Sequence, residues 1–395
     1  MRVRPFLAAV AACVVASALS PGVASAVTPG QNGRIAFARL VDDGWEIISI
    51  NADGSGETNL TNNADLGLAD DLSPAWSPDG SRIAFESLRF GNGGSEIYVM
   101  NADGTGQTNL TNSSDASEWD PAWSPDGTKI AYTKCCPTGD TEIFVMNADG
   151  TGAANLTNHS SWDADAAWSP DGARIAFTTN RVDPDAHEVF VMNADGTAQT
   201  NLTNSATQDW GPSWSPDGSR IAFSTDRDSD LYAMSADGSQ QTPLPDTPGL
   251  DLWPAWSPDG NALTFVSYWP DGNPDVYTVN VDGTGLANLT TSISSEREPD
   301  WQATGSAPPP PSGDGTVTGT VATTTGHPMS GATIAWKGPE SGSTQTIASG
   351  RYLMGGMQPG KYRLTASARG CQSRSASVEI KAGGTVKRDF RLSCR

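Results

Sequence analysis

Six acidic residues recur at one position of a repeated motif and are the first candidates for a binding site. Each lies five residues before a tryptophan of the repeat; they are Asp71, Glu118, Asp163, Asp209, Asp251 and Glu296. Hard cations prefer carboxylate oxygens, so a ring of such residues could bind Ca²⁺, the one cofactor that this pattern suggests, or a cationic peptide. The competing interpretation is structural, because Asp side chains often accept hydrogen bonds from the backbone of their own loop.

Aromatic residues at positions that do not repeat are the candidates for ligand contact. They lie in connections whose length and content vary from copy to copy: Trp119, Trp162, Trp210, Trp253 and Trp269. Exposed aromatic rings among carboxylates and amides suit sugars or peptides. The alternative interpretation is that several of these rings pack inward beneath the loops.

Two histidines are the candidates for metal chemistry. His159 lies in the connection that enters the fourth repeat, and His187 stands beside Glu188 at the start of a strand of that repeat. Two imidazoles and a carboxylate could hold a transition metal; the alternative is that both histidines are solvated loop residues. The sequence has no Gly-x-Ser-x-Gly motif and three histidines in all, so no nucleophilic hydrolase is indicated.

The elements that must position these residues are six copies of one unit of about 45 residues. The aligned tryptophans of the six copies are Trp76, Trp123, Trp168, Trp214, Trp256 and Trp301. Each copy contains four short strands, such as "PAW", "RIAFES", "EIYVMN" and "QTNLTN", with S-P-D-G and N-A-D-G as hairpin turns. A four-stranded repeat of this length is typical of a β-propeller blade. The tryptophan is expected to pack between blades.

The order of the repeats predicts how the ring closes. The first copy lacks its first strand, and the strand around Trp301 has no copy after it. We therefore expect the Trp301 strand to complete the first blade, which gives six blades and buries the edges that an open stack would expose. Strands that run up and down place the six acids and the variable connections on one face, and the two short turns on the other.

The repeated residues also resemble a known family. W-S-P-D-G-x-[RK]-I-A-F, followed by [ED]-[IV]-[YF]-V-M-N-A-D-G, is similar to the WD40-like Pro-Asp repeat of TolB-type propellers over about residues 31–303. The resemblance implies a TolB-like six-bladed β-propeller over residues 27–303. Related repeats occur in propellers of prolyl peptidases and of oligogalacturonate lyases, and the lyases use a metal site.

A second domain follows the repeats. Residues 304–315 contain "GSAPPPPSGDG", a Pro-rich and extended linker. Residues 316–395 have the short strands of a β-sandwich, and G-T-V at Gly319, "GHPMSGATI" and "SGRYLMGGMQPGKYRLTASARG" resemble the carboxypeptidase-regulatory-like, transthyretin-like domain. Cys371 and Cys394 are expected to form a disulfide in it. For the neighbours Cys135 and Cys136, a disulfide and two free thiols both remain open.

The N-terminus and the charge limit the location and the partners. Residues 1–26 have two arginines, an apolar run and Ala24-Ser25-Ala26, the pattern of a secretory signal peptide cleaved after Ala26. No other stretch is long and apolar enough to span a bilayer. Residues 27–314 carry 11 basic and 42 acidic side chains, whereas residues 315–395 carry 11 and 3. The strong negative charge of residues 27–314 disfavours nucleic acid and anionic lipid as partners.

These observations predict an all-β, secreted or cell-surface protein, outside the cytoplasm and monomeric. Its first domain is a six-bladed β-propeller closed by the Trp301 strand, and its second is a small Ig-like or transthyretin-like β-sandwich. The function we predict is non-enzymatic binding or scaffolding. The acidic propeller face would bind a protein, a peptide or a cell-wall glycan, and the basic sandwich would be an accessory adhesion module. The alternative is a metal-dependent, lyase-like enzyme that acts on glycans through the His159/His187 face.

Overall fold

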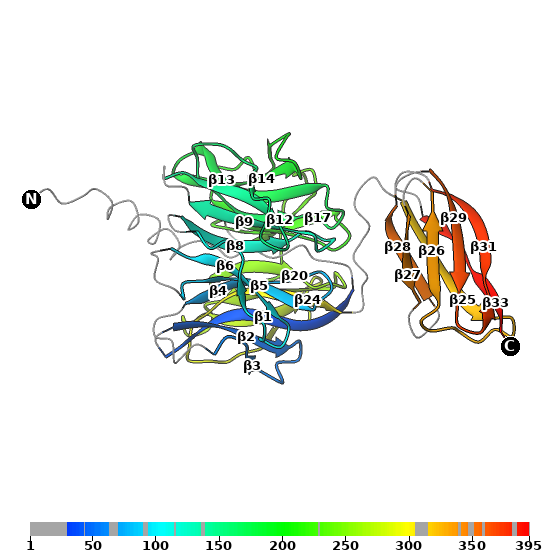
Figure 1. The fold of residues 1–395 in the computed structure, drawn as a ribbon. Coiled ribbons are helices and arrows are strands. Elements are labelled where there is room, and N and C mark those ends of the chain that lie inside the picture. The colour runs from blue at the N-terminus through cyan, green and yellow to red at the C-terminus, as the bar shows by residue number, and fades with distance from the viewer. Residues whose placement is uncertain are drawn as a thin grey trace, which may run out of the picture. The chain divides into compact units, whose positions relative to one another are not determined.

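The computed structural model describes residues 30–42, 44–62, 70–89, 94–113, 116–135, 139–227, 230–304, 315–338, 341–346, 351–357, 360–380 and 385–394. The predicted signal peptide, most of the predicted linker and Cys136 lie outside these residues. The chain divides into two compact units between residues 306 and 307, inside the predicted linker (Figure 1).

The first unit contains six antiparallel four-stranded sheets, which we number as blades in chain order. Blade 1 consists of β24 (Glu296–Thr304), β1 (Gln31–Val41), β2 (Gly44–Asn51) and β3 (Thr58–Asn59). Blade 2 consists of β4 (Asp71–Trp76), β5 (Arg82–Ser87), β6 (Glu96–Asn101) and β7 (Thr108–Asn109). Blade 3 consists of β8 (Ser117–Trp123), β9 (Lys129–Cys135), β10 (Thr141–Asn147) and β11 (Ala154–Asn155).

The remaining three blades repeat the pattern. Blade 4 consists of β12 (Asp163–Trp168), β13 (Arg174–Asp183), β14 (Ala186–Asn193) and β15 (Thr200–Asn201). Blade 5 consists of β16 (Asp209–Trp214), β17 (Arg220–Thr225), β18 (Leu231–Ser235) and β19 (Thr242–Pro243). Blade 6 consists of β20 (Asp251–Trp256), β21 (Ala262–Ser267), β22 (Asp275–Asn280) and β23 (Ala287–Asn288).

The ring closes as the repeat order predicts. β24 pairs with β1 in antiparallel register, with Trp301 opposite Ile35 and Glu296 opposite Arg39. The first strands of the six blades contact one another around the ring, so they are the innermost strands. Closure leaves no blade without a partner on either side, which removes the exposed edges of an open stack.

The repeat tryptophan packs between neighbouring blades, as predicted. Trp168 of blade 4 belongs to a buried cluster that includes Ala122 and Ile143 of blade 3. On several blades an arginine of the preceding blade covers the ring: the Arg174 guanidinium lies 4.6 Å from the centre of the Trp214 ring. Because each tryptophan fills the space between two sheets, it fixes the spacing of the blades.

The two repeated turns are structural, also as predicted. In the first S-P-D-G copy, Asp79 Oδ1 accepts hydrogen bonds from the Ser77 hydroxyl and from the Ser81 amide, and Gly80 has φ +67°. In the first N-A-D-G copy, Asp53 Oδ1 accepts from the Ser55 amide and hydroxyl. An acidic side chain that bonds to the backbone ahead, with glycine at positive φ, is what a tight turn requires.

The second unit is a sandwich of two sheets around one core. One sheet contains β28 (Arg351–Met357), β25 (Gly315–Thr323), β33 (Phe390–Cys394) and β30 (Cys371–Gln372), with β32 (Thr385–Lys387) also paired to β25. The other contains β27 (Ser341–Gln345), β26 (Thr333–Lys337), β29 (Gly360–Ser367) and β31 (Arg374–Ile380). Val317, Ile334, Tyr362, Leu364 and Leu392 are among its buried core residues.

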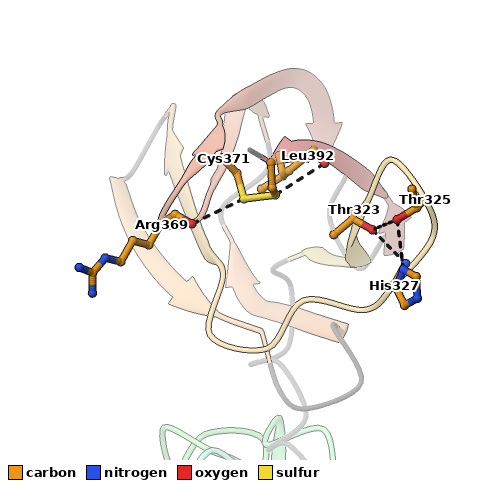
Figure 2. Close-up of a disulfide and its surroundings, with 7 residues drawn as sticks. Thr323, Thr325, His327, Arg369, Cys371 and Leu392 are labelled. Carbon is orange, nitrogen blue, oxygen red and sulfur yellow. Dashed lines mark hydrogen bonds between the residues drawn. A yellow bond between two sulfur atoms is a disulfide. The ribbon is translucent and has the colours of Figure 1, made fainter.

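The expected disulfide joins two strands of the first of these sheets. Cys371 of β30 and Cys394 of β33 are directly opposite each other, and their sulfur atoms are bonded (Figure 2). The bridge ties the end of the sandwich to a strand 23 residues earlier in the chain. A cross-link of this kind reduces the conformational freedom of the unfolded chain, which matters in a unit of so few residues.

Candidate functional site

The six predicted acids stand together at one end of the propeller, at the beginning of the innermost strands. All six are 0 % exposed. The sequence placed them correctly on one face, which carries the connections between blades and those between the second and third strands of each blade. We call this end the variable face. Their burial means that they form an internal ring beneath the loops.

Five of the six carboxylates form an ion pair with a basic side chain of their own blade. The pairs are Asp71–Arg89 at 2.6 Å, Glu118–Lys134 at 2.7 Å, Asp163–Arg181 at 2.9 Å, Asp209–Arg227 at 2.7 Å and Glu296–Arg39 at 2.8 Å. The propeller has 11 basic residues, and five of them are used here. These contacts support the structural interpretation of the acids, because each charge is matched inside the protein.

The position of the basic partner depends on whether the acid is glutamate or the shorter aspartate. Where the acid is glutamate, the cation is directly opposite it on the second strand, as in Glu118–Lys134 and Glu296–Arg39. Where the acid is aspartate, the cation is an arginine two residues after the position opposite the acid, and its side chain folds back toward the carboxylate. The Arg181 guanidinium then lies 5.2 Å from the centre of the Phe177 ring and 5.1 Å from that of Phe190. The longer reach of arginine compensates for the shorter acid.

Blade 6 breaks this rule. Its acid is Asp251, and the position that holds arginine in blades 2, 4 and 5 holds Trp269. The carboxylate is instead bonded by the Thr247 hydroxyl at 2.8 Å and the Thr247 amide. Burial without a cation raises the pKa of Asp251 to about 6. In blade 6 alone, therefore, the internal ring lacks its positive partner.

Three large apolar side chains are exposed in the connections of blade 6. Trp269 is 40 % exposed, Leu250 46 % and Ile293 100 %. These three residues lie in three connections that are hydrogen bonded to one another. The Tyr268 amide donates to the Leu250 carbonyl, and the Asn273 side-chain amide donates to the carbonyls of Ser292 and Ser294, on either side of Ile293. We call these three residues the blade-6 patch.

The other four predicted contact aromatics are less accessible. Trp119 and Trp253 are buried, and Trp162 and Trp210 are half-buried. Trp162 packs against the His187 ring, with the ring centres 4.9 Å apart. For Trp119 and Trp253 the structure therefore supports the inward-packing interpretation, and Trp269 is the aromatic residue of the predicted set that is most open to a ligand.

The predicted metal ligands are not gathered into one site. The Glu188 carboxylate accepts hydrogen bonds from Thr203 and Ser205, while His187 Nδ1 is 3.1 Å from the side-chain oxygen of Gln208. The His159 amide donates to Glu142. In the part of the chain that the structure describes, no three His, Cys, Asp or Glu side chains are placed to hold a metal ion. The three residues are engaged separately.

Sequence reasoning missed a second set of acids nearer the propeller axis. Glu86, Asp120, Asp165 and Glu298 are all buried. The Ser73 hydroxyl lies 2.8 Å from Asp120 Oδ1 and 2.9 Å from Glu298 Oε2, so three neighbouring innermost strands meet there. We call these four residues the inner carboxylates.

None of the inner carboxylates forms an ion pair within the described residues. No hydrogen bond of standard geometry reaches Asp120 Oδ2 or either oxygen of Asp165. Burial raises the pKa of Glu86 and of Asp165 to about 8, and it also raises the pKa of Asp120 and Glu298. The nearby carboxylates oppose ionisation further. At neutral pH, Glu86 and Asp165 are therefore held mainly in their protonated form.

Comparison with known protein families finds a match within each unit. Residues 32–185 match the TolB beta propeller domain, and residues 316–393 match the carboxypeptidase regulatory-like domain. No curated protein sequence matches the chain.

Solved structures give the same result for the propeller. The chain is similar to TolB from Acinetobacter baumannii, with a TM-score of 0.60, 22 % identity and coverage of 69 % of this chain and 67 % of that one. It is similar to a putative TolB from Agrobacterium tumefaciens, with a TM-score of 0.51, 22 % identity and coverage of 65 % and 88 %. A chain of a nidogen/laminin complex has a TM-score of 0.56 and 11 % identity, with coverage of 68 % and 98 %. These are likenesses of fold.

The protein is thus an all-β protein built on a β-propeller. More particularly, it consists of a TolB-like six-bladed propeller followed by a carboxypeptidase regulatory-like β-sandwich, which confirms the resemblance that its repeats carry. None of the described residues forms a helix that could cross a membrane.

Proposed function

We propose that this protein is a secreted, non-enzymatic binding protein, and that its blade-6 patch receives a segment of a protein partner. The observation that carries the proposal is the replacement of the ring cation by exposed Trp269 in one blade of six. A structural need that recurs in every blade explains the five ion pairs. A ligand has no sixfold symmetry, so a single departure from the repeat is where specific recognition is expected.

The chemistry of the patch favours a protein segment. Leu250 and Ile293 present aliphatic side chains beside an indole, a combination that packs apolar side chains and offers few hydrogen bonds to a sugar. Acidic residues border it: Asp230 accepts a hydrogen bond from the Asp251 amide, and Asp271 is exposed two residues after Trp269. The segment we expect therefore combines apolar side chains with lysine or arginine.

The location outside the cytoplasm is part of the same proposal. It is supported by the Cys371–Cys394 disulfide, since such bonds persist in oxidising compartments, and by the signal-peptide pattern of residues 1–26. The TolB-like fold agrees with a binding or scaffold role. In this proposal the sandwich is the accessory adhesion module.

A peptide-display selection against the full chain tests the patch. Selected peptides should be rich in aliphatic or aromatic residues next to lysine or arginine, and their affinity is then measured by calorimetry. The Trp269→Ala variant should bind at least about ten-fold more weakly, because exposed tryptophans dominate interfaces of this kind. Its melting temperature should stay close to that of the wild type, because the side chain is on the surface.

Leu286→Ser is the matched control. The exposed fraction of Leu286, 43 %, is similar to that of Leu250. Leu286 lies after an N-V-D-G turn, however, at the opposite end of blade 6. The Leu286→Ser variant should bind the selected peptides as the wild type does, whereas the Leu250→Ser variant should not. Peptides that bind Trp269→Ala as tightly as the wild type would place the binding surface elsewhere and contradict the proposal.

A further inference from the structure

We infer that the outward face of the sandwich sheet β27-β26-β29-β31 binds an anionic glycan, a polysaccharide that carries carboxylates along its chain. The inference rests on the proposed role of the sandwich as an adhesion module and names its ligand class. It is carried by a row of three residues across β26, β29 and β31: Lys337, Arg363 and Ser377. We call these residues the basic row.

The basic row contains two like charges in direct opposition. Lys337 and Arg363 are register partners on antiparallel strands, and both are exposed. Side chains at such positions have their β-carbons about 5 Å apart, and like charges there destabilise a sheet. The six ion pairs found among the described residues all lie in the propeller. Within the described residues, neither Lys337 nor Arg363 forms an ion pair with a carboxylate.

Among the described residues, the acids around the row do not compensate for this repulsion. The described residues of the sandwich include two acids, and neither neutralises the pair. Asp389 accepts hydrogen bonds from the Thr320 amide and hydroxyl on the other sheet. Glu379 is opposite Lys361, one row away on the same face. An anion that bridges Lys337 and Arg363 would relieve a repulsion that the described residues leave in place.

The remaining residues of the face suit a sugar polymer. Next to the basic row lie Thr365 and Ser375, whose hydroxyls are 2.9 Å apart, and beyond them Ser367 of β29 opposite Thr333 of β26. Hydroxyl side chains can donate and accept hydrogen bonds, as sugar hydroxyls do. Lys361 lies two residues from Arg363 on the same strand, about 7 Å away, so cationic groups repeat along the sheet.

The same face offers little to a nucleic acid. Trp336 is opposite the buried Leu364 and packs against the core, so its ring is not on the outward side for a base to stack on. Arginine binds carboxylate through two parallel hydrogen bonds, which matches a uronate better than a neutral sugar. We therefore assign the face to a polyuronate-type glycan.

Binding of alginate, a polymer of uronic acids, to the full chain tests the inference. The Lys337→Gln/Arg363→Gln double variant should lose at least ten-fold in affinity, measured by biolayer interferometry in 50 mM NaCl. The matched control is Lys387→Gln/Arg391→Gln, which removes two exposed charges from the other sheet and should change affinity less than three-fold. Neutral pullulan should not bind, and affinity for alginate should fall in 300 mM NaCl.

Stability is the second measurement, because it separates a binding role from a structural one. Removing both of the repelling charges costs the sheet nothing, so the double variant should melt at the wild-type temperature or above it. A lower melting temperature would show that Lys337 and Arg363 serve the fold, and would overturn the inference. Equal losses in both double variants, or tighter binding of duplex DNA than of alginate, would overturn it as well.

Testing each of the two variants in the other binding assay distinguishes this inference from the proposed function. Trp269→Ala should leave alginate binding unchanged, and Lys337→Gln/Arg363→Gln should leave binding of the selected peptides unchanged. If alginate fails to bind while the peptides still bind the blade-6 patch, the glycan assignment fails alone. If the peptides fail and alginate binds, the proposed function of the propeller fails alone.

Discussion

The Arg181→Ala variant is expected to lose about 3–5 kcal/mol of unfolding free energy. Arg181 Nη2 lies 2.9 Å from both oxygens of Asp163, which is 0 % exposed. Removing the guanidinium leaves a buried carboxylate without its cation and uncovers the rings of Phe177 and Phe190. Denaturant unfolding followed by tryptophan fluorescence measures the effect in the propeller, since 12 of the 13 tryptophans precede the linker.

Two comparisons show whether the lost charge pair is the cause. Lys129→Ala removes a cation from an exposed position of β9 and should change stability by less than about 0.5 kcal/mol. Asp163→Ala combined with Arg181→Met removes both charges and should recover much of the loss, because no unpaired charge remains buried. A loss below 1 kcal/mol for Arg181→Ala alone would show that the ring pairs contribute little to the fold.

The Asp165→Asn variant is expected to be more stable than the wild type, and increasingly so as the pH rises. Burial raises the pKa of Asp165 to about 8 in the folded protein, whereas an unfolded aspartate has a pKa near 4. The stability that the protonated acid provides is complete below the unfolded pKa and is lost as the pH rises toward 8. The gain from asparagine should grow by up to about 1.4 kcal/mol per pH unit between pH 5.5 and 8.

Denaturant midpoints at pH 5.5, 6.5, 7.5 and 8.5 measure this trend in both proteins. Asp53→Asn is the matched control, because the pKa of Asp53 is lowered by its hydrogen bonds with Ser55. Its stabilising contribution is already complete above the unfolded pKa, so Asp53→Asn should be destabilising by a constant amount over this range. A pH-independent difference for Asp165→Asn would mean that the inner carboxylates do not control the pH dependence of folding.

The sequence was sufficient for the architecture because the signals of a propeller blade are local. The tryptophan, the S-P-D-G turn and the N-A-D-G turn each act within a few residues, and their order alone predicted that β24 closes blade 1. The face that carries the six acids was also predicted correctly. Their cations were missed, although the sequence carries a signal for them. Arg89, Arg181 and Arg227 each follow the acid of their blade by 18 residues.

The inner carboxylates could not be found in the same way. Three of the four depend on a break in strand register at the third residue before a repeat tryptophan, where Asp120, Asp165 and Glu298 have φ between +50° and +57°. Such a bulge takes the side chains out of the two-residue alternation of a strand, so an alternating pattern assigns them to the wrong side. The same position holds serine, glycine and tryptophan in the other blades, which hides any repeat.

The pairing of β24 with β1 also determines when the ring can be completed. The innermost strand of blade 1 is the last strand of the propeller to be made, and almost the whole propeller separates it from its partner in the chain. Until residue 304 has been synthesised, β1 presents an unpaired edge to other chains. Closure is therefore a late step with a high entropic cost. Nascent chains, and chains truncated before Glu296, are the species in which blade 1 is open to pairing with a second molecule.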